Sequence, residues 1–232
     1  MGLKEDLIAE VNQTFKNQWD VQETTDVPDP EDLRLNRNHA KDLESVTVLY
    51  ADIDGSTKMV DQFKWSFCAE VYKAYLRCAA QIIRSKGGTI TAYDGDRVMA
   101  VFTGEYKNSR AVEAAMKINF AVLKIIRPAI QNQYPRENFI FKHVIGIDSS
   151  ELHTARIGVH GENDLVWIGQ AANYAAKLCT LSGKPVWITK AVYDKMNKGV
   201  KFSNGEDMWT PYTWDAMNNM EIFATAYHWG SC

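Results

Sequence analysis

The sequence lacks the segments and spacings that mark several common classes of protein. It has no apolar run near the ~20 residues that cross a bilayer, and its charged N-terminus has no apolar signal core. The four cysteines show no CxxC spacing and the five histidines no HxxxH spacing, which argues against a disulfide framework and a zinc site. A formal charge of −3 gives no general attraction to nucleic acid or anionic membrane. We therefore expect a soluble, cytoplasmic protein with reduced thiols that binds neither of these directly.

The composition indicates one folded domain with a short N-terminal appendage. Hydrophobic residues make up 46% of the 232 residues and charged residues 24%, which are globular proportions. Residues 1–20 carry apolar side chains at four-residue steps, which is typical of an amphipathic helix. The following stretch is polar and holds two of the six prolines. We predict a helix and polar connector over residues 1–44 and the main domain over residues 45–232.

Hydrophobic periodicity and turn signals predict the secondary structure of the main domain. Strands are expected at 46–51, 89–93, 96–102, 139–149, 155–159, 165–168, 185–189 and 221–229, and helices at about 63–82, 109–130, 171–181 and 191–196. The order strand, helix, two strands, helix, strand predicts an α+β fold of the ferredoxin-like (split βαβ) type, with an antiparallel central sheet and helices on one face. This fold hosts many activities, so the function has to be argued from the site.

Two carboxylates fall where the predicted fold can bring them together. Asp52 ends the first strand and Asp96 opens the strand after a DG turn. Such a pair of carboxylates suits Mg²⁺ or Mn²⁺. Two such ions favour attack by a 3′-hydroxyl on an α-phosphorus with pyrophosphate leaving. The alternative interpretation is that both acids are surface turn residues. Gly55, Ser56 and Thr57 lie where the chain turns into a helix, whose free N–H groups can bind phosphate. The plainer interpretation is that Ser56 or Thr57 caps that helix.

Three stretches, taken together and in order, resemble the catalytic domain of class III adenylyl and guanylyl cyclases. LYADIDGST at 49–57 resembles the first metal motif of the family, and DGDRVMAVF at 94–102 resembles the second. WIGQAANYAAKL at 167–178 resembles the signature on the helix that supplies transition-state residues. The three matches span much of the predicted domain in the strand, turn and helix contexts that they require.

The resemblance implies an active site and an assembly. Asp52, Asp96 and the backbone carbonyl of Ile53 would hold two Mg²⁺ or Mn²⁺ ions per active site, and Asn173 would orient the ribose. In this family the metal-binding and transition-state residues come from opposite subunits. The resemblance therefore also implies a homodimer with two equivalent active sites at the interface.

Three positions depart from the family pattern. Lys177 stands where the family has its transition-state arginine, and it brings charge but not a bidentate fork. It either stabilises the developing phosphate charge or is a solvated helix lysine. Ala92 and Val166 stand at the two positions where adenylyl and guanylyl cyclases carry polar residues that read the purine. The residues that recognise a purine are therefore missing.

Two other side chains are candidates for base recognition. Tyr50 stands where the family often has phenylalanine and is two residues from Asp52, on the same face of the strand. Its phenol can donate and accept, so it could reach a smaller base, or it could be a strand tyrosine packed in the core. Arg97 is a second candidate, although strict alternation along the strand points it away from Asp96.

A compact cyclase domain with this tyrosine and without purine readers looks like the pyrimidine cyclases of Pycsar antiphage systems. The resemblance implies conversion of UTP or CTP to the 3′,5′-cyclic monophosphate and pyrophosphate, and the product would activate a separate membrane or TIR-domain effector. We favour UTP because uracil offers O2 and O4 as acceptors. The alternatives are an adenylate cyclase with atypical base contacts and a catalytically weak, nucleotide-binding pseudo-cyclase affected by Lys177. The retained Asp52 and Asp96 argue against the pseudo-cyclase.

Overall fold

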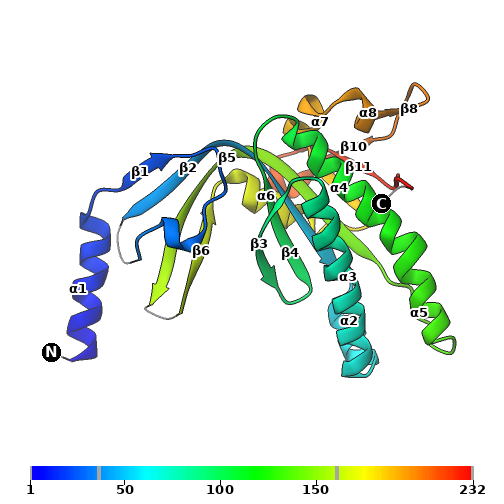
Figure 1. The fold of residues 1–232 in the computed structure, drawn as a ribbon, viewed down its shortest axis with the longest axis horizontal. Coiled ribbons are helices and arrows are strands. Elements are labelled where there is room, and N and C mark those ends of the chain that lie inside the picture. The colour runs from blue at the N-terminus through cyan, green and yellow to red at the C-terminus, as the bar shows by residue number, and fades with distance from the viewer. Residues whose placement is uncertain (1, 36–37, 160–161, 231–232) are drawn as a thin grey trace.

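The structure is a computed structural model that describes residues 2–35, 38–159 and 162–230 (Figure 1). The helices are α1 (Leu3–Lys16), α2 (Ser56–Gln62), α3 (Trp65–Ser85), α4 (Lys107–Ala121), α5 (Arg127–Gln133), α6 (Gln170–Leu178), α7 (Lys190–Lys195) and α8 (Lys198–Lys201), with a π-helical turn η2 (Val122–Ile126) and 3₁₀ turns η1 (Pro30–Asp32) and η3 (Asp215–Met217). The strands are β1 (Asp20–Glu23), β2 (His39–Ile53), β3 (Thr89–Asp94), β4 (Arg97–Phe102), β5 (His143–Val159), β6 (Glu162–Ile168), β7 (Val186–Thr189), β8 (Phe202–Ser203), β9 (Glu206–Asp207), β10 (Thr210–Trp214) and β11 (Met220–Thr225).

The central sheet confirms the predicted α+β fold and its split βαβ arrangement. The strands follow the order β10-β11-β7-β5-β2-β4-β3, with β1 and β6 pairing to β2 and β5. The segment β5-β2-β4-β3 is antiparallel, as predicted. The sheet as a whole is mixed, because β7 runs parallel to β5 and β1 runs parallel to β2.

Helices cover both faces of the sheet rather than one face as predicted. Alternate residues of β2 divide between two hydrophobic cores: Leu49 packs in the core formed with α3 and α4, and Val48 packs in the core formed with α6. On the α6 side, a Cβ atom added to Gly146 of β5 would lie 2.1 Å from the carbonyl oxygen of Ala175. Glycine therefore permits the close contact between α6 and β5 that fixes the position of α6.

The two longest strands extend beyond the central sheet and carry the N-terminal part of the fold. The register of β2 against β5 shifts between Leu43 and Val46, and the outer halves of both strands continue between β1 and β6 (Figure 1). The two strands predicted at 139–149 and 155–159 are therefore one strand, because the polar residues between them remain paired with β2. The polar stretch before residue 45 contains β1, η1 and the start of β2, while a division at residue 44 stays a prediction.

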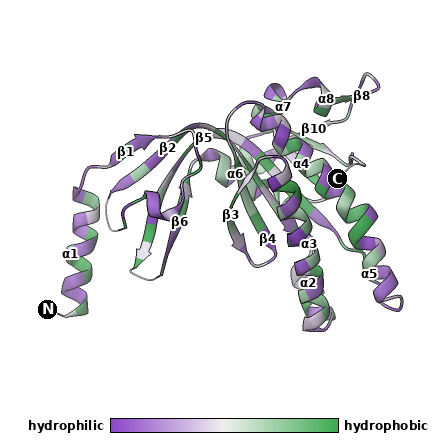
Figure 2. Cartoon of the chain, viewed as in Figure 1, coloured by the Kyte–Doolittle hydropathy of each residue, from purple (hydrophilic) through white to green (hydrophobic). Residues whose placement is uncertain are grey.

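The predicted N-terminal helix is present as α1, and its apolar side chains are exposed to solvent. Phe15 is 86% exposed and Leu3 76% exposed, and Figure 2 shows green and purple residues along the same helix. Asn38 holds the end of α1 by donating from Nδ2 to the backbone oxygens of Thr14 and Asn17, at 3.0 and 2.6 Å. Among the described residues, the hydrogen bonds that join α1 to later parts of the chain are therefore made at its C-terminal end.

Within residues 2–35, 38–159 and 162–230, no helix combines the length and the apolar character needed to cross a membrane.

Candidate active site

Asp52 lies near the end of a central strand, and Asp96 lies in a turn beside that end. Asp52 is the second-last residue of β2, and Asp96 lies in the turn between β3 and β4 rather than at the start of the strand as predicted. β4 pairs with β2 up to Val98 opposite Ala51, so the turn lies beside the end of β2. The charge of Asp96 is the second cause, after burial, of the raised pKa of Asp52. The two carboxylates are thus close enough to repel one another.

The surroundings of this pair suit a cation. Burial and the charge of Asp96 raise the pKa of Asp52 to about 6. Oδ1 of Asp52 accepts a hydrogen bond of 3.0 Å from the N–H of Ile53, whereas the buried Oδ2 of Asp96 has no partner among the described residues. A buried, unpartnered carboxylate oxygen is costly, and a divalent cation would satisfy both groups. The residues present therefore fit the Mg²⁺ or Mn²⁺ expected from the sequence.

The raised pKa predicts that Asp52 destabilises the metal-free protein at neutral pH. A carboxyl with a pKa of about 6 in the folded state and near 3.8 when unfolded costs stability above pH 6 and costs little below pH 4. In a chelator at pH 7, Asp52→Asn should raise the free energy of unfolding by about 1 kcal/mol, allowing for solvent screening of this half-exposed group. Urea unfolding at pH 7 and pH 4 measures the difference, which should nearly vanish at pH 4. A variant less stable than the parent at pH 7 would contradict this electrostatic interpretation.

A buried network fixes the backbone at Asp52. The hydroxyl of Tyr75 donates to the backbone oxygen of Asp52 at 3.3 Å and lies 3.5 Å from Nδ1 of His143. Nε2 of His143 lies 3.1 Å from Oδ1 of Asn119, whose amide nitrogen donates to two other backbone oxygens. Burial lowers the pKa of His143 to about 3, so the ring is neutral. Sequence reasoning missed these three residues, because they come from α3, β5 and α4.

The four residues considered for base recognition line one pocket. A cavity of about 280 Å³ is bordered by Tyr50, Ala92, Arg97 and Val166. Tyr50 of β2 is opposite Met99 of β4, which is opposite Ala92 of β3, so the pocket floor crosses three strands. β6 brings Val166 to the opposite side, and in Figure 1 it extends in the same direction as the β3–β4 hairpin.

Arg97 faces this pocket although alternation from Asp96 had pointed it away. Because Asp96 lies in the turn, β4 begins at Arg97, and Arg97 shares the face of Met99. Its guanidinium carbon lies 5.3 Å from the ring centroid of Tyr50, and Nη2 forms an ion pair of 2.7 Å with Asp94. Sequence reasoning gave no role to Asp94, which positions the arginine.

Trp167 is a lining residue that sequence reasoning missed. It borders the same cavity, and its indole Nε1 is buried without a hydrogen-bond partner among the described residues. Nε of Arg97 is likewise buried and unpartnered. Buried donors without partners are unfavourable unless a ligand supplies acceptors. Trp167 lies inside the third matched motif, but nothing in the sequence distinguished it from a core tryptophan.

The segment that follows Asp52 does not begin the first long helix. Gly55 has φ +82° and is the N-cap of the short helix α2, and α3 is a separate helix. The positive φ favours glycine at this position. Since Gly55 is the cap, the interpretation of Ser56 or Thr57 as the cap is wrong, and no side chain caps the first turn.

Asn173 and Lys177 form no hydrogen bond or ion pair with Asp52 or Asp96 among the described residues. They lie one turn apart on the exposed side of α6, while Ala171 and Ala175 of the same helix are buried against the sheet. Nζ of Lys177 lies 3.7 Å from the sulfur of Met217. Both residues are available to a second molecule.

Residues 38–222 match the family model of the adenylate and guanylate cyclase catalytic domain. The chain belongs to this family. The assignment made from the three motifs is confirmed, and the match begins within the stretch predicted as a connector.

Individual relatives agree with this family. Over 229 residues, which are 99% of this chain and 99% of each relative, the chain is 58% identical to a uridylate cyclase of Burkholderia cepacia and 49% identical to a uridylate cyclase of Xanthomonas perforans. The solved guanylyl cyclase Cya2 superposes with a TM-score of 0.67 at 18% identity, covering 80% of this chain and 93% of that one. The adenylyl cyclase CyaB from P. aeruginosa gives 0.65 at 20% identity, covering 80% and 94%. The structural matches establish the cyclase fold.

Proposed function

We propose that this cyclase converts UTP to 3′,5′-cyclic UMP and pyrophosphate. The observation that carries the proposal is the cavity lined by Tyr50, Arg97 and Trp167, three side chains that each carry a hydrogen-bond donor. Uracil presents two carbonyl acceptors, which match such donors. The names of the two relatives described above support the same substrate.

The lining of the base pocket favours a pyrimidine over a purine. Ala92 and Val166 contribute apolar surface at the positions where purine cyclases have polar readers. Burial raises the pKa of Tyr50, so its phenol keeps its proton and can donate to a uracil oxygen. The purine alternative gains no support from these contacts, and UTP is favoured over CTP because the amino group of cytosine would face donors rather than acceptors.

Asp52 and Asp96, with the backbone carbonyl of Ile53, would hold the divalent cations. Two such cations, when bound, activate the attacking 3′ oxygen and neutralise the charge that develops on pyrophosphate. Asp52 has to lose its proton before it can bind a cation, so cation affinity should rise as the pH passes about 6. The backbone N–H groups of Gly55, Ser56 and Thr57 would contact the phosphates.

The catalytic unit is proposed to be a homodimer. Asn173 and Lys177 are exposed on α6 without a bond to Asp52 or Asp96, so they are free to reach the substrate held by a second subunit. In that position Asn173 would orient the ribose, and Lys177 would stabilise charge on the phosphates. Each subunit would then contribute half of two equivalent sites.

The direct test is to incubate the purified protein separately with UTP, CTP, GTP and ATP in the presence of Mn²⁺ and to identify products by mass. We expect cyclic UMP as the main product and little product from either purine. Main production of cyclic AMP would favour an adenylate cyclase with atypical base contacts. Absence of a cyclic product from all four would favour the pseudo-cyclase.

Tyr50→Phe should lower the selectivity for UTP over the other triphosphates by about tenfold, since it removes one hydrogen bond to the base. The ratios of kcat/KM for the four triphosphates measure the effect, and the total activity should fall less than the selectivity. Tyr93→Phe is the matched control, because Tyr93 is an exposed tyrosine of the neighbouring strand β3. Unchanged ratios in Tyr50→Phe would remove the proposed role.

The resemblance to the Pycsar cyclases supports a role in antiphage defence. We infer that the cyclic pyrimidine nucleotide is made in the cytoplasm and activates a separate membrane or TIR-domain effector. Mass spectrometry of nucleotides from cells expressing the chain, before and after phage infection, tests this role. A level of cyclic UMP that does not respond to infection would contradict it.

A further inference from the structure

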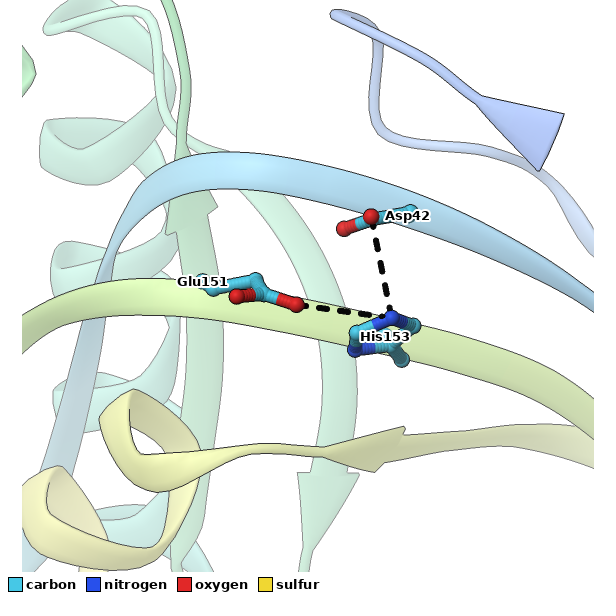
Figure 3. Close-up of side chains that lie close together, drawn as sticks. All are labelled: Asp42, Glu151 and His153. Atoms are coloured by element: carbon cyan, nitrogen blue, oxygen red, sulfur yellow. Dashed lines mark ion pairs between the residues drawn. The ribbon is translucent and has the colours of Figure 1, made fainter. Parts of the chain in front are cut away.

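Three side chains with metal-binding atoms, Asp42, Glu151 and His153, meet on β2 and β5 (Figure 3). Asp42 stands ten residues before Asp52 along β2. Nε2 of His153 lies 3.7 Å from Oδ2 of Asp42 and 3.5 Å from Oε1 of Glu151, and the three ligand atoms lie within 4.8 Å of one another. Asp42 is directly opposite His153 in the strand register, and Glu151 precedes His153 by two residues. Backbone pairing therefore holds the three side chains on one side of the sheet.

The distances fit ligands around a cation better than a simple ion pair. Direct hydrogen bonds from an imidazolium to a carboxylate are about 2.7–2.9 Å long, and both contacts of His153 exceed this. Two ligands at about 2.1 Å from a tetrahedral metal ion lie about 3.4 Å apart. The separations of 3.7 and 3.5 Å around His153 are close to that value.

The negative charges of this cluster also exceed the positive charge available to balance them. Asp42 and Glu151 carry two negative charges when ionised, and His153 can supply one positive charge at most. Among the described residues, no lysine or arginine forms an ion pair with either carboxylate. Oδ1 of Asp42 is buried and has no hydrogen-bond partner in the same part of the chain. The one hydrogen bond or ion pair of the Asp42 carboxylate among the described residues is therefore that from Oδ2 to His153 at 3.7 Å.

We propose that Asp42, Glu151 and His153 form a binding site for Zn²⁺ that is separate from the catalytic cations. One imidazole and two carboxylates suit Zn²⁺ better than Mg²⁺, which rarely uses histidine. Glu151 has a side chain that is 60% exposed, so the site is open to an entering ion and to a water ligand. The spacing of the histidines argued against a zinc site, but the ligands come from strands more than 100 residues apart in the sequence.

The position of the site gives the ion a structural role toward α6. A Cβ atom on Gly169, just before α6, would lie 2.8 Å from the backbone oxygen of Glu151. The N–H of Ala171 in the first turn of α6 donates to Oγ of Ser150 at 2.9 Å. A Zn²⁺ ion that links β2 to β5 at Glu151 therefore restrains the part of β5 that contacts the first turn of α6.

Zinc binding is tested in the full chain carrying Asp52→Asn and Asp96→Asn, which removes the other carboxylate pair. Isothermal titration with ZnCl₂ should give about one ion per chain, and adding His153→Gln or Asp42→Asn should weaken binding by about 10–100-fold. Co²⁺ in place of Zn²⁺ should give a visible absorption band that His153→Gln abolishes. Zn²⁺ should also raise the Tm of the chain that carries only Asp52→Asn and Asp96→Asn, but not of the same chain with His153→Gln added.

The matched control is His228→Gln, because His228 stacks on Phe120 and belongs to no group of possible metal ligands among the described residues. This control should bind Zn²⁺ as the parent does. Glu151→Gln gives a second test at an exposed position where folding is not at risk, and it should also weaken binding. Failure of the parent to bind Zn²⁺, or equal affinity in the parent and the His153→Gln chain, would overturn the proposal. These results do not depend on which nucleotide is cyclised.

Discussion

Asp96→Ala should lower the rate of cyclisation by at least about 10³-fold, because it removes one of two carboxylates that hold the catalytic cations. Oδ2 of Asp96 is buried beside Asp52 without a hydrogen-bond partner among the described residues, so it contributes little to folding that a cation would not supply. Asp52→Ala should have an effect of the same size. Turnover of UTP at saturating Mn²⁺, followed as cyclic UMP released, measures both.

Asp54→Ala is the control for these two variants. Asp54 is exposed and lies two residues from Asp52. Its backbone N–H donates to the backbone oxygen of Lys142 at 3.1 Å, and the substitution retains this bond. We expect this variant to keep near parental activity. Near parental turnover in Asp96→Ala or Asp52→Ala, with Asp54→Ala behaving alike, would remove the two-metal assignment. Circular dichroism and the Tm confirm that the compared variants are folded.

Mixing two inactive variants should restore activity if the active site is shared between subunits. Asp96→Ala damages the cation-binding half, and Asn173→Ala damages the half on α6, so each homodimer has no intact site. A mixed dimer has one site in which Asp96 and Asn173 are both intact. With random exchange half of the dimers are mixed, so about a quarter of the parental activity should return. Titration of one variant against the other, with cyclic UMP as the readout, measures the recovery.

A second mixture separates subunit sharing from any general effect of mixing. Asp52→Ala with Asp96→Ala places both damages in the same half, so a mixed dimer still has no intact site and no activity should return. If Asp96→Ala with Asn173→Ala also fails to recover while exchange is verified, the two halves belong to one subunit. The exposure of Asn173 and Lys177 on α6 would then need another explanation.

Some features of the site could be predicted because they depend on neighbours in the sequence. The DG dipeptide before Asp96 is a local hairpin signal, and β3 and β4 do pair around it. The three motifs were enough to identify the family, which residues 38–222 match. The proximity of Asp52 to Asp96 also followed, because the order of strands in a split βαβ fold places the first strand beside that hairpin.

Other features could not be predicted because they depend on the exact residue at which a strand begins or ends. The displacement of Asp96 into the turn reversed the expected direction of Arg97, since one residue of register changes the face of every following side chain. Two predicted strands proved to be one, because Ser149 bonds to the backbone oxygen of Val46 and keeps a polar stretch in the sheet.

The sequence by itself determined the fold class and the family, and it predicted that Asp52 and Asp96 lie close together, since each of these rests on a local pattern or on the order of elements. The tertiary structure decided what surrounds them: the pocket that joins Tyr50 to Trp167, the buried support of Asp52, and the meeting of Asp42 with His153. These contacts join residues far apart in the chain. Their geometry is set by strand register and by helix packing on both faces of the sheet, which no short stretch of sequence specifies.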